Sequence, residues 1–127
     1  MNKLQQFSAP AGRLFLALIF VMSGFSKIGQ YEQTQGYMEM MGVPGALLPL
    51  VILTEVIAGL AIVLGWKTKV AAFALAGFSV MSAILFHADF SNPAEMTNFM
   101  KNISLAGAFL ILFSQGAGAY SLDNRQK

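Results

Sequence analysis

One acidic residue, Glu55, stands alone near the middle of a long apolar stretch of the sequence. A charged group at the depth of a lipid bilayer costs at least about 2.5–3.5 kcal/mol, so a carboxylate there needs a basic partner, a proton or a water-filled cavity. Such a group can handle protons or bind a ligand. It can equally form an interhelical salt bridge that fixes the packing of helices. The sequence leaves both roles open.

Two basic residues in the first apolar stretch are candidate partners for this carboxylate. Arg13 and Lys27 lie fourteen positions apart, and with Ala17, Phe20 and Gly24 between them they fall on one face of a helix. The small residues on that face allow a close approach of a neighbouring helix. We therefore expect both basic side chains to point into the bundle near opposite ends, where either could reach Glu55. The alternative is that both extend to the membrane surfaces.

Further polar residues occur where later apolar stretches begin or end. His87 follows the third stretch, and Lys101 and Asn102 open the fourth. With Lys27 they predict a polar cluster at the extracytoplasmic rim, although a lone histidine at a helix end is more often an ordinary interfacial residue. The complete candidate set for ligand binding, or for a buried polar network, is Arg13, Lys27, Glu55, His87, Lys101 and Asn102.

Several kinds of chemistry are excluded or disfavoured by the residue types. The chain has no cysteine and one histidine, which rules out a disulfide or a thiol catalyst and predicts no dedicated metal site. Haem ligation by His87 with a methionine stays open. No catalytic triad, phosphate loop or dinucleotide fingerprint is present. The net charge of +2 gives no reason to expect a nucleic acid partner.

The composition predicts that a lipid bilayer is the solvent of this chain. Of the 127 residues, 56% are hydrophobic and 11% are charged, whereas soluble domains average about 25% charged residues. Four apolar blocks of about 17–21 residues match a hydrocarbon core of about 30 Å. They lack the alternation of barrel strands. We predict an all-α membrane protein, a single domain over residues 1–127 with four transmembrane helices at about 11–28, 46–66, 70–87 and 100–116.

The segments between the helices predict the orientation in the membrane. Most basic residues lie at the two termini and in the short loop at Lys67 and Lys69, so the positive-inside rule places both termini in the cytoplasm. Residues 30–42 are polar and rich in methionine. This segment fits a short amphipathic helix on the membrane surface or an ordinary loop equally well.

A set of short motifs in a fixed order resembles the DoxX family of small bacterial inner-membrane proteins. The first is Arg13 followed by Gly-Phe-Ser-Lys at 24–27. The second is Gly-Val-Pro at 42–44 followed by Glu55 and Gly59. His87 at the end of the third helix and Lys101-Asn102 at the start of the fourth also fit, as does Gly-Ala-Gly-Ala-Tyr-Ser-Leu-Asp at 116–123. The resemblance covers nearly the whole chain and implies a multi-pass protein of the inner membrane.

The family resemblance also implies a function. The founding member is a membrane subunit of a thiosulfate:quinone oxidoreductase, so we expect a membrane subunit of a quinone-linked redox assembly with a soluble redox partner protein. Glu55 and His87 would then handle protons. Lys27, Lys101 and Asn102 would polarise quinone oxygens or hold an anionic ligand. The alternatives are a carrier or channel for ions or small molecules, which would require a homo-oligomer, and a non-catalytic membrane scaffold.

Overall fold

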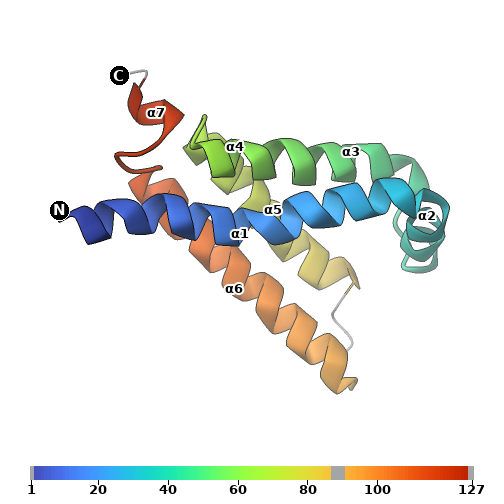
Figure 1. The fold of residues 1–127 in the computed structure, drawn as a ribbon. Coiled ribbons are helices and arrows are strands. Elements are labelled where there is room, and N and C mark those ends of the chain that lie inside the picture. Colours follow the sequence, from blue (N-terminus) through green and yellow to red (C-terminus); the bar gives the residue numbers. More distant parts are fainter. Residues whose placement is uncertain (1, 87–90, 126–127) are drawn as a thin grey trace.

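The computed structural model describes residues 2–86 and 91–125, and the regular elements of this part of the chain are helical (Figure 1). In chain order they are α1 (Lys3–Gly29), α2 (Tyr31–Met40), η1 (Gly45–Leu47), α3 (Leu48–Leu53), η2 (Thr54–Ala58), α4 (Gly59–Leu64), α5 (Thr68–Phe86), α6 (Pro93–Gln115) and α7 (Leu122–Arg125). Within the described residues, four helical segments are long and apolar enough to cross a membrane: α1, Gly45–Leu64, α5 and α6. The predicted all-α bundle of four transmembrane helices is confirmed. We call Gly45–Leu64, which runs from η1 through α4, the second span.

Local capping explains why two helices begin earlier than the hydropathy predicts. The Asn2 side chain accepts a hydrogen bond from the backbone N–H of Gln5 at 2.9 Å, and the Gln5 side chain accepts one from the N–H of Asn2 at 3.2 Å. This reciprocal cap starts α1 at Lys3 rather than near residue 11. At the start of α6 the Asn92 side chain accepts one hydrogen bond, from the backbone N–H of Ala94 at 3.0 Å, and Pro93 occupies the first turn, where no N–H is needed. In the segment 30–42, for which helix and loop were both open, the structure has the helix α2.

The four spans associate as two pairs. Helix α1 runs alongside the second span and contacts α3, η2 and α4, while α5 and α6 pack against each other (Figure 1). The second span also contacts α5 through η2 and α4, which joins the two pairs. The start of α1 and the short helix α7 lie at the same end of the bundle (Figure 1). The positive-inside rule predicts that this end faces the cytoplasm.

Glycines let α1 and the second span approach closely. A Cβ atom on Gly24 would overlap the side chain of Val56, and a Cβ on Gly59 would lie 2.8 Å from Cγ2 of Val21. Small residues at such positions are the usual device for bringing transmembrane helices together. The second span also contains one π-helical turn, η2, which holds Glu55. Single π turns inside α-helices often occur at functional sites.

A dense core fills the half of the bundle near the termini. Phe20 of α1 meets Phe109 of α6 edge to face, with ring centroids 5.4 Å apart. The other members of this core are mostly alanines, whose small side chains allow all four spans to converge. The core residues are Ala17, Phe20, Ala58, Ala61, Ile62, Ala71, Ala72, Leu75, Ala76 and Phe109.

Gly65, which ends α4, provides a test of this architecture. Its φ of +69° is unfavourable for other residues, and a Cβ there would lie 2.5 Å from Nη1 of Arg13 and overlap Ser121. We expect Gly65→Ala to lower the free energy of unfolding in detergent by about 1–3 kcal/mol. Gly77→Ala is the matched control, because no atom lies within 4 Å of its would-be Cβ. The control should be neutral or slightly stabilising, and equal losses in both variants would contradict the structure.

Candidate functional site

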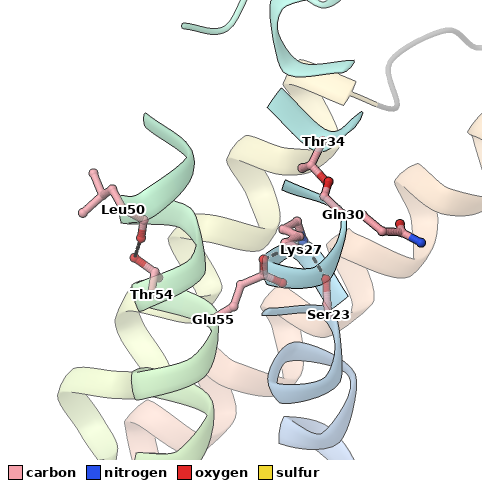
Figure 2. A network of polar contacts seen from close by, with 7 residues as sticks. All are labelled: Ser23, Lys27, Gln30, Thr34, Leu50, Thr54 and Glu55. Atoms are coloured by element: carbon pink, nitrogen blue, oxygen red, sulfur yellow. Dashed lines mark hydrogen bonds and ion pairs between the residues drawn. The ribbon is translucent and has the colours of Figure 1, made fainter. Parts of the chain in front are cut away.

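The carboxylate of Glu55 is buried and paired with Lys27. Glu55 is 2% exposed, and its Oε1 lies 2.6 Å from Nζ of Lys27. The same ammonium group donates a hydrogen bond to the Oγ of Ser23, one turn earlier on α1, at 2.6 Å (Figure 2). About 14–15 Å of helix separates Glu55 from either end of the second span. The charge at membrane depth is therefore neutralised by a neighbouring helix.

The local geometry of both helices brings this pair together. Gly24 lies one turn before Lys27, and its would-be Cβ is 3.4 Å from Cβ of Glu55. Any larger residue there would push the second span away from α1. The π turn of η2 displaces Glu55 from the regular α-helical register. The neighbouring Thr54 hydroxyl donates to the carbonyl of Leu50, in the same span, at 2.8 Å (Figure 2). This hydrogen bond therefore does not link the second span to α1.

A cavity of about 600 Å³ opens beside the pair, in the half of the bundle away from the termini. All four spans and α2 contribute to its walls, which are mostly aliphatic, aromatic and methionine side chains. Among the predicted site residues, the structure gathers four around this cavity: Lys27, Glu55, Lys101 and Asn102. The cavity thus combines a large apolar surface with a few polar groups, which is the usual composition of a small-molecule site.

Other polar residues line the same cavity and were missed by the sequence reasoning. The most informative are Asn98, three positions before Lys101 on α6, and Tyr37 on α2. The spacing of Asn98 and Lys101 places them on one helix face, a signal that the sequence did carry. Burial, and then the negative charge of Glu95, raise the pKa of Tyr37. A tyrosine phenol is protonated at neutral pH even at its ordinary pKa, so Tyr37 is a hydrogen-bond donor there.

Arg13 is buried at the opposite end of the bundle and takes no part in this site. Its Nη1 donates to the carbonyls of Ile62 and Val63 at 3.0 and 3.1 Å, and its Nη2 donates to the carbonyl of Tyr120. The expectation that Arg13 could reach Glu55 is therefore wrong. The physical reason is that α4 ends at Gly65, so its last carbonyls lie at the negative end of the helix dipole and attract the guanidinium. The carbonyl of Ile62 accepts from Arg13 in addition to the backbone N–H of Gly65.

The C-terminal tail is held at the same end by Asp123. Its carboxylate accepts hydrogen bonds from the backbone N–H groups of Lys67 and Thr68 at 2.6 and 2.8 Å, which caps the start of α5. Partial burial raises the pKa of Asp123, but the contacts with Thr68 and Lys67 and the charge of Arg13 outweigh it, and the net pKa is lowered. Because the Thr68 hydroxyl makes no hydrogen bond of normal geometry, we assign most of the lowering to the two backbone donors.

His87, the remaining member of the predicted set, lies outside the residues that the structure describes. Within residues 2–86 and 91–125, no group of three or more His, Asp or Glu side chains is positioned to hold a metal ion. The described site is thus built from one carboxylate, two ammonium groups, amides and hydroxyls.

These features define a small integral membrane protein with an internal polar site among four membrane-spanning helices. The DoxX family model matches residues 9–88, which include most of α1, the whole second span and all of α5. The chain belongs to the DoxX family.

Two curated relatives from Escherichia coli (strain K12) match almost end to end. The inner membrane protein YqjF is 45% identical over 97% of this chain and 95% of its own length. The inner membrane protein YphA is 36% identical over 98% of this chain and 100% of its own length. No solved structure matches the chain significantly. The relatives and the four spans identify the chain as an integral protein of the bacterial inner membrane.

A double-mutant cycle tests the buried pair. Lys27→Met leaves Glu55 charged and buried, and should cost about 3–5 kcal/mol of unfolding free energy. Glu55→Gln should cost less, because Lys27 is 25% exposed and can reach water. The double variant should be more stable than the sum of the single losses predicts. Lys69→Met serves as the control, since Lys69 is exposed at the other end of the bundle. Additive losses in the cycle would contradict an energetically coupled pair.

The capping role of Asp123 predicts a pH dependence of stability. Because its folded pKa is lowered, its contribution is fully present above the ordinary value of about 4 and is lost as the pH falls through the lower, folded pKa. Asp123→Asn should therefore lower the melting temperature at pH 7, and the difference from wild type should shrink below about pH 4. Glu32→Gln, at an exposed position on α2, is the control. A difference independent of pH would show that the charge of Asp123 is not involved.

Proposed function

We propose that this protein is the membrane subunit of a quinone-linked redox assembly and that the cavity beside Glu55 binds the quinone. The observation that carries the proposal is the cavity itself, about 600 Å³ with mostly apolar walls and a buried ion pair in its lining. Ligand sites of this kind span about 300–1,000 Å³ and present a few polar groups from apolar walls. A quinone has a matching chemistry, because its ring and tail are apolar and its two oxygens accept hydrogen bonds.

The residues around the cavity have distinct roles in this proposal. Lys101 and Asn102 donate hydrogen bonds to quinone oxygens, and the Lys27–Glu55 pair supplies a group that can exchange a proton at membrane depth. His87 keeps the proton-handling role expected from the sequence. Reduction of a quinone to a quinol takes two electrons and two protons. Since the chain has no cysteine and carries little mass outside the bilayer, the electrons would come from a soluble redox partner protein.

A carrier or channel is less well supported by the packing. The cavity ends at the alanine-rich core, where Ala17, Leu75 and Phe109 are fully buried. A route through one copy would have to pass this core, so transport requires rearrangement or a homo-oligomer. A scaffold without a ligand would need the ion pair but not the cavity. Flux measurements in liposomes separate transport from quinone binding.

Blocking the cavity tests the proposal. Ser82→Phe adds a ring to the cavity wall on α5, whereas Ile84→Phe enlarges a side chain that is 58% exposed on the same helix. Both variants and the wild type would be purified from native membranes, and the quinone in their lipid extracts would be measured. We expect a near-stoichiometric quinone with wild type and Ile84→Phe, and a loss of about tenfold or more with Ser82→Phe. Wild-type protein that carries no quinone would refute the proposal.

A further inference from the structure

The charged residues of the cavity do not cancel. Its described lining contains Lys27, Glu55 and Lys101, which sum to one positive charge. Lys27 and Glu55 neutralise each other at 2.6 Å. Lys101 forms no hydrogen bond or ion pair with the part of the chain that the structure describes. The net charge of the lining is therefore located at Lys101.

An unpaired ammonium group on a membrane-spanning helix is costly. Lys101 lies about 12 Å along α6 from its start at Pro93, counting 1.5 Å per residue. Insertion of a lysine at the centre of a span costs about 2.5–3.5 kcal/mol, less where its long side chain reaches the interface. An anion in the cavity would lower this cost, because the attraction between two charges grows as water is removed from around them.

The residues next to Lys101 also favour the binding of an anion. Asn98, Lys101, Asn102 and Leu105 all line the cavity and lie on one face of α6. The ammonium group and the two amides offer several N–H donors from adjacent positions, a set that suits a compact group of acceptor oxygens. Hydrogen bonds from a cation to an anionic oxygen are roughly twice as strong as neutral ones. Leu105 continues this face toward the dense core.

Among the described residues, the acidic groups near the cavity do not remove this charge. Glu55 is committed to Lys27, whose ammonium also donates to Ser23. Glu95 acts electrostatically on Tyr37, but it is not among the lining residues and lies about 9 Å along α6 from Lys101. Lys101 is an exposed residue that also contributes to the lining, so its positive charge borders the mostly apolar cavity. The negative charge of Glu95 lies toward the helix start.

We propose that the cavity binds an amphiphile whose head group carries one negative charge, and that Lys101, with Asn98 and Asn102, binds that charge. If the ligand is an ionised hydroxyquinone or a quinol anion, this proposal specifies the ligand of the quinone function and rests on that function. The same chemistry describes the carboxylate of a long-chain fatty acid. In both cases the apolar body of the ligand lies against the aliphatic and aromatic walls.

Matched ligand pairs test the proposal with the intact protein in nanodiscs of zwitterionic phosphatidylcholine. The first pair is an alkylated hydroxynaphthoquinone, ionised at neutral pH, and its neutral methyl ether. The second pair is hexadecanoate and its methyl ester. Equilibrium binding should favour the anion of at least one pair by about tenfold or more, which is about 1.4 kcal/mol. Lys101→Met should remove this preference, Lys101→Arg should retain it, and Lys69→Met, at the other end of the bundle, should leave it unchanged.

Each outcome bears on the two proposals separately. A preference for the ionised quinone that depends on Lys101 supports both. A preference for hexadecanoate without binding of either quinone supports the anion site and refutes the quinone function. Equal binding of the anionic and neutral quinones, with no effect of Lys101→Met, overturns the anion site and the hydrogen bond proposed from Lys101, and leaves quinone binding in the cavity standing. Because Lys101 has no described partner to lose and its unpaired charge is costly, its variants should have a melting temperature no lower than that of the wild type. Asn98→Leu, which should weaken anion binding, provides an independent variant.

Discussion

The carboxylate of Glu55 constrains the structure more than any other group. It is 2% exposed and lies in the middle of a membrane-spanning segment, where a lone charge costs at least about 2.5–3.5 kcal/mol. A cation must therefore come from another helix, and a lysine side chain reaches it only if the two backbones approach closely. Gly24 allows that approach, and the π turn of η2 carries the carboxylate. The end of α1, the register of the second span and one wall of the cavity all depend on this pair.

The bundle is divided into two halves with different side chains. Near the termini, alanines let four helices converge on Phe109, and Arg13 and Asp123 satisfy the backbone groups at the ends of α4 and α5. Beyond this core the lining residues are large, so the helices stand apart and leave space between them. Phe20 belongs to both halves, because it is buried in the core and lines the cavity. The packed half thus fixes the floor of the site, and a ligand would not have to organise it.

The sequence predicted the face of α1 and the need for a partner at Glu55, but not which partner. Helical spacing alone places Arg13 and Lys27 on one face, and both have the reach. The choice depends on how α1 is shifted along the second span, which is set by the contacts of Gly24 and Gly59 and by the end of α4 at Gly65. None of these is a property of a single segment. The cavity could not be predicted from the sequence for the same reason, because its volume depends on how far the two helix pairs diverge.

Lys27 and Lys101 were both predicted from the sequence to bind a ligand, but their contacts in the structure differ. Lys27 donates hydrogen bonds to Ser23 and Glu55, so its charge stabilises the packing of α1 against the second span. A ligand anion could compete for it only by leaving Glu55 buried and unpaired, a loss of several kcal/mol. Lys101 forms no hydrogen bond or ion pair with the described residues, so a ligand could bind to its charge without breaking such a contact. The ion pair therefore does more than stabilise the bundle: it neutralises one cation and one anion of the described lining and leaves one positive charge there, at Lys101. Under our proposal that remaining charge determines which head groups the cavity selects.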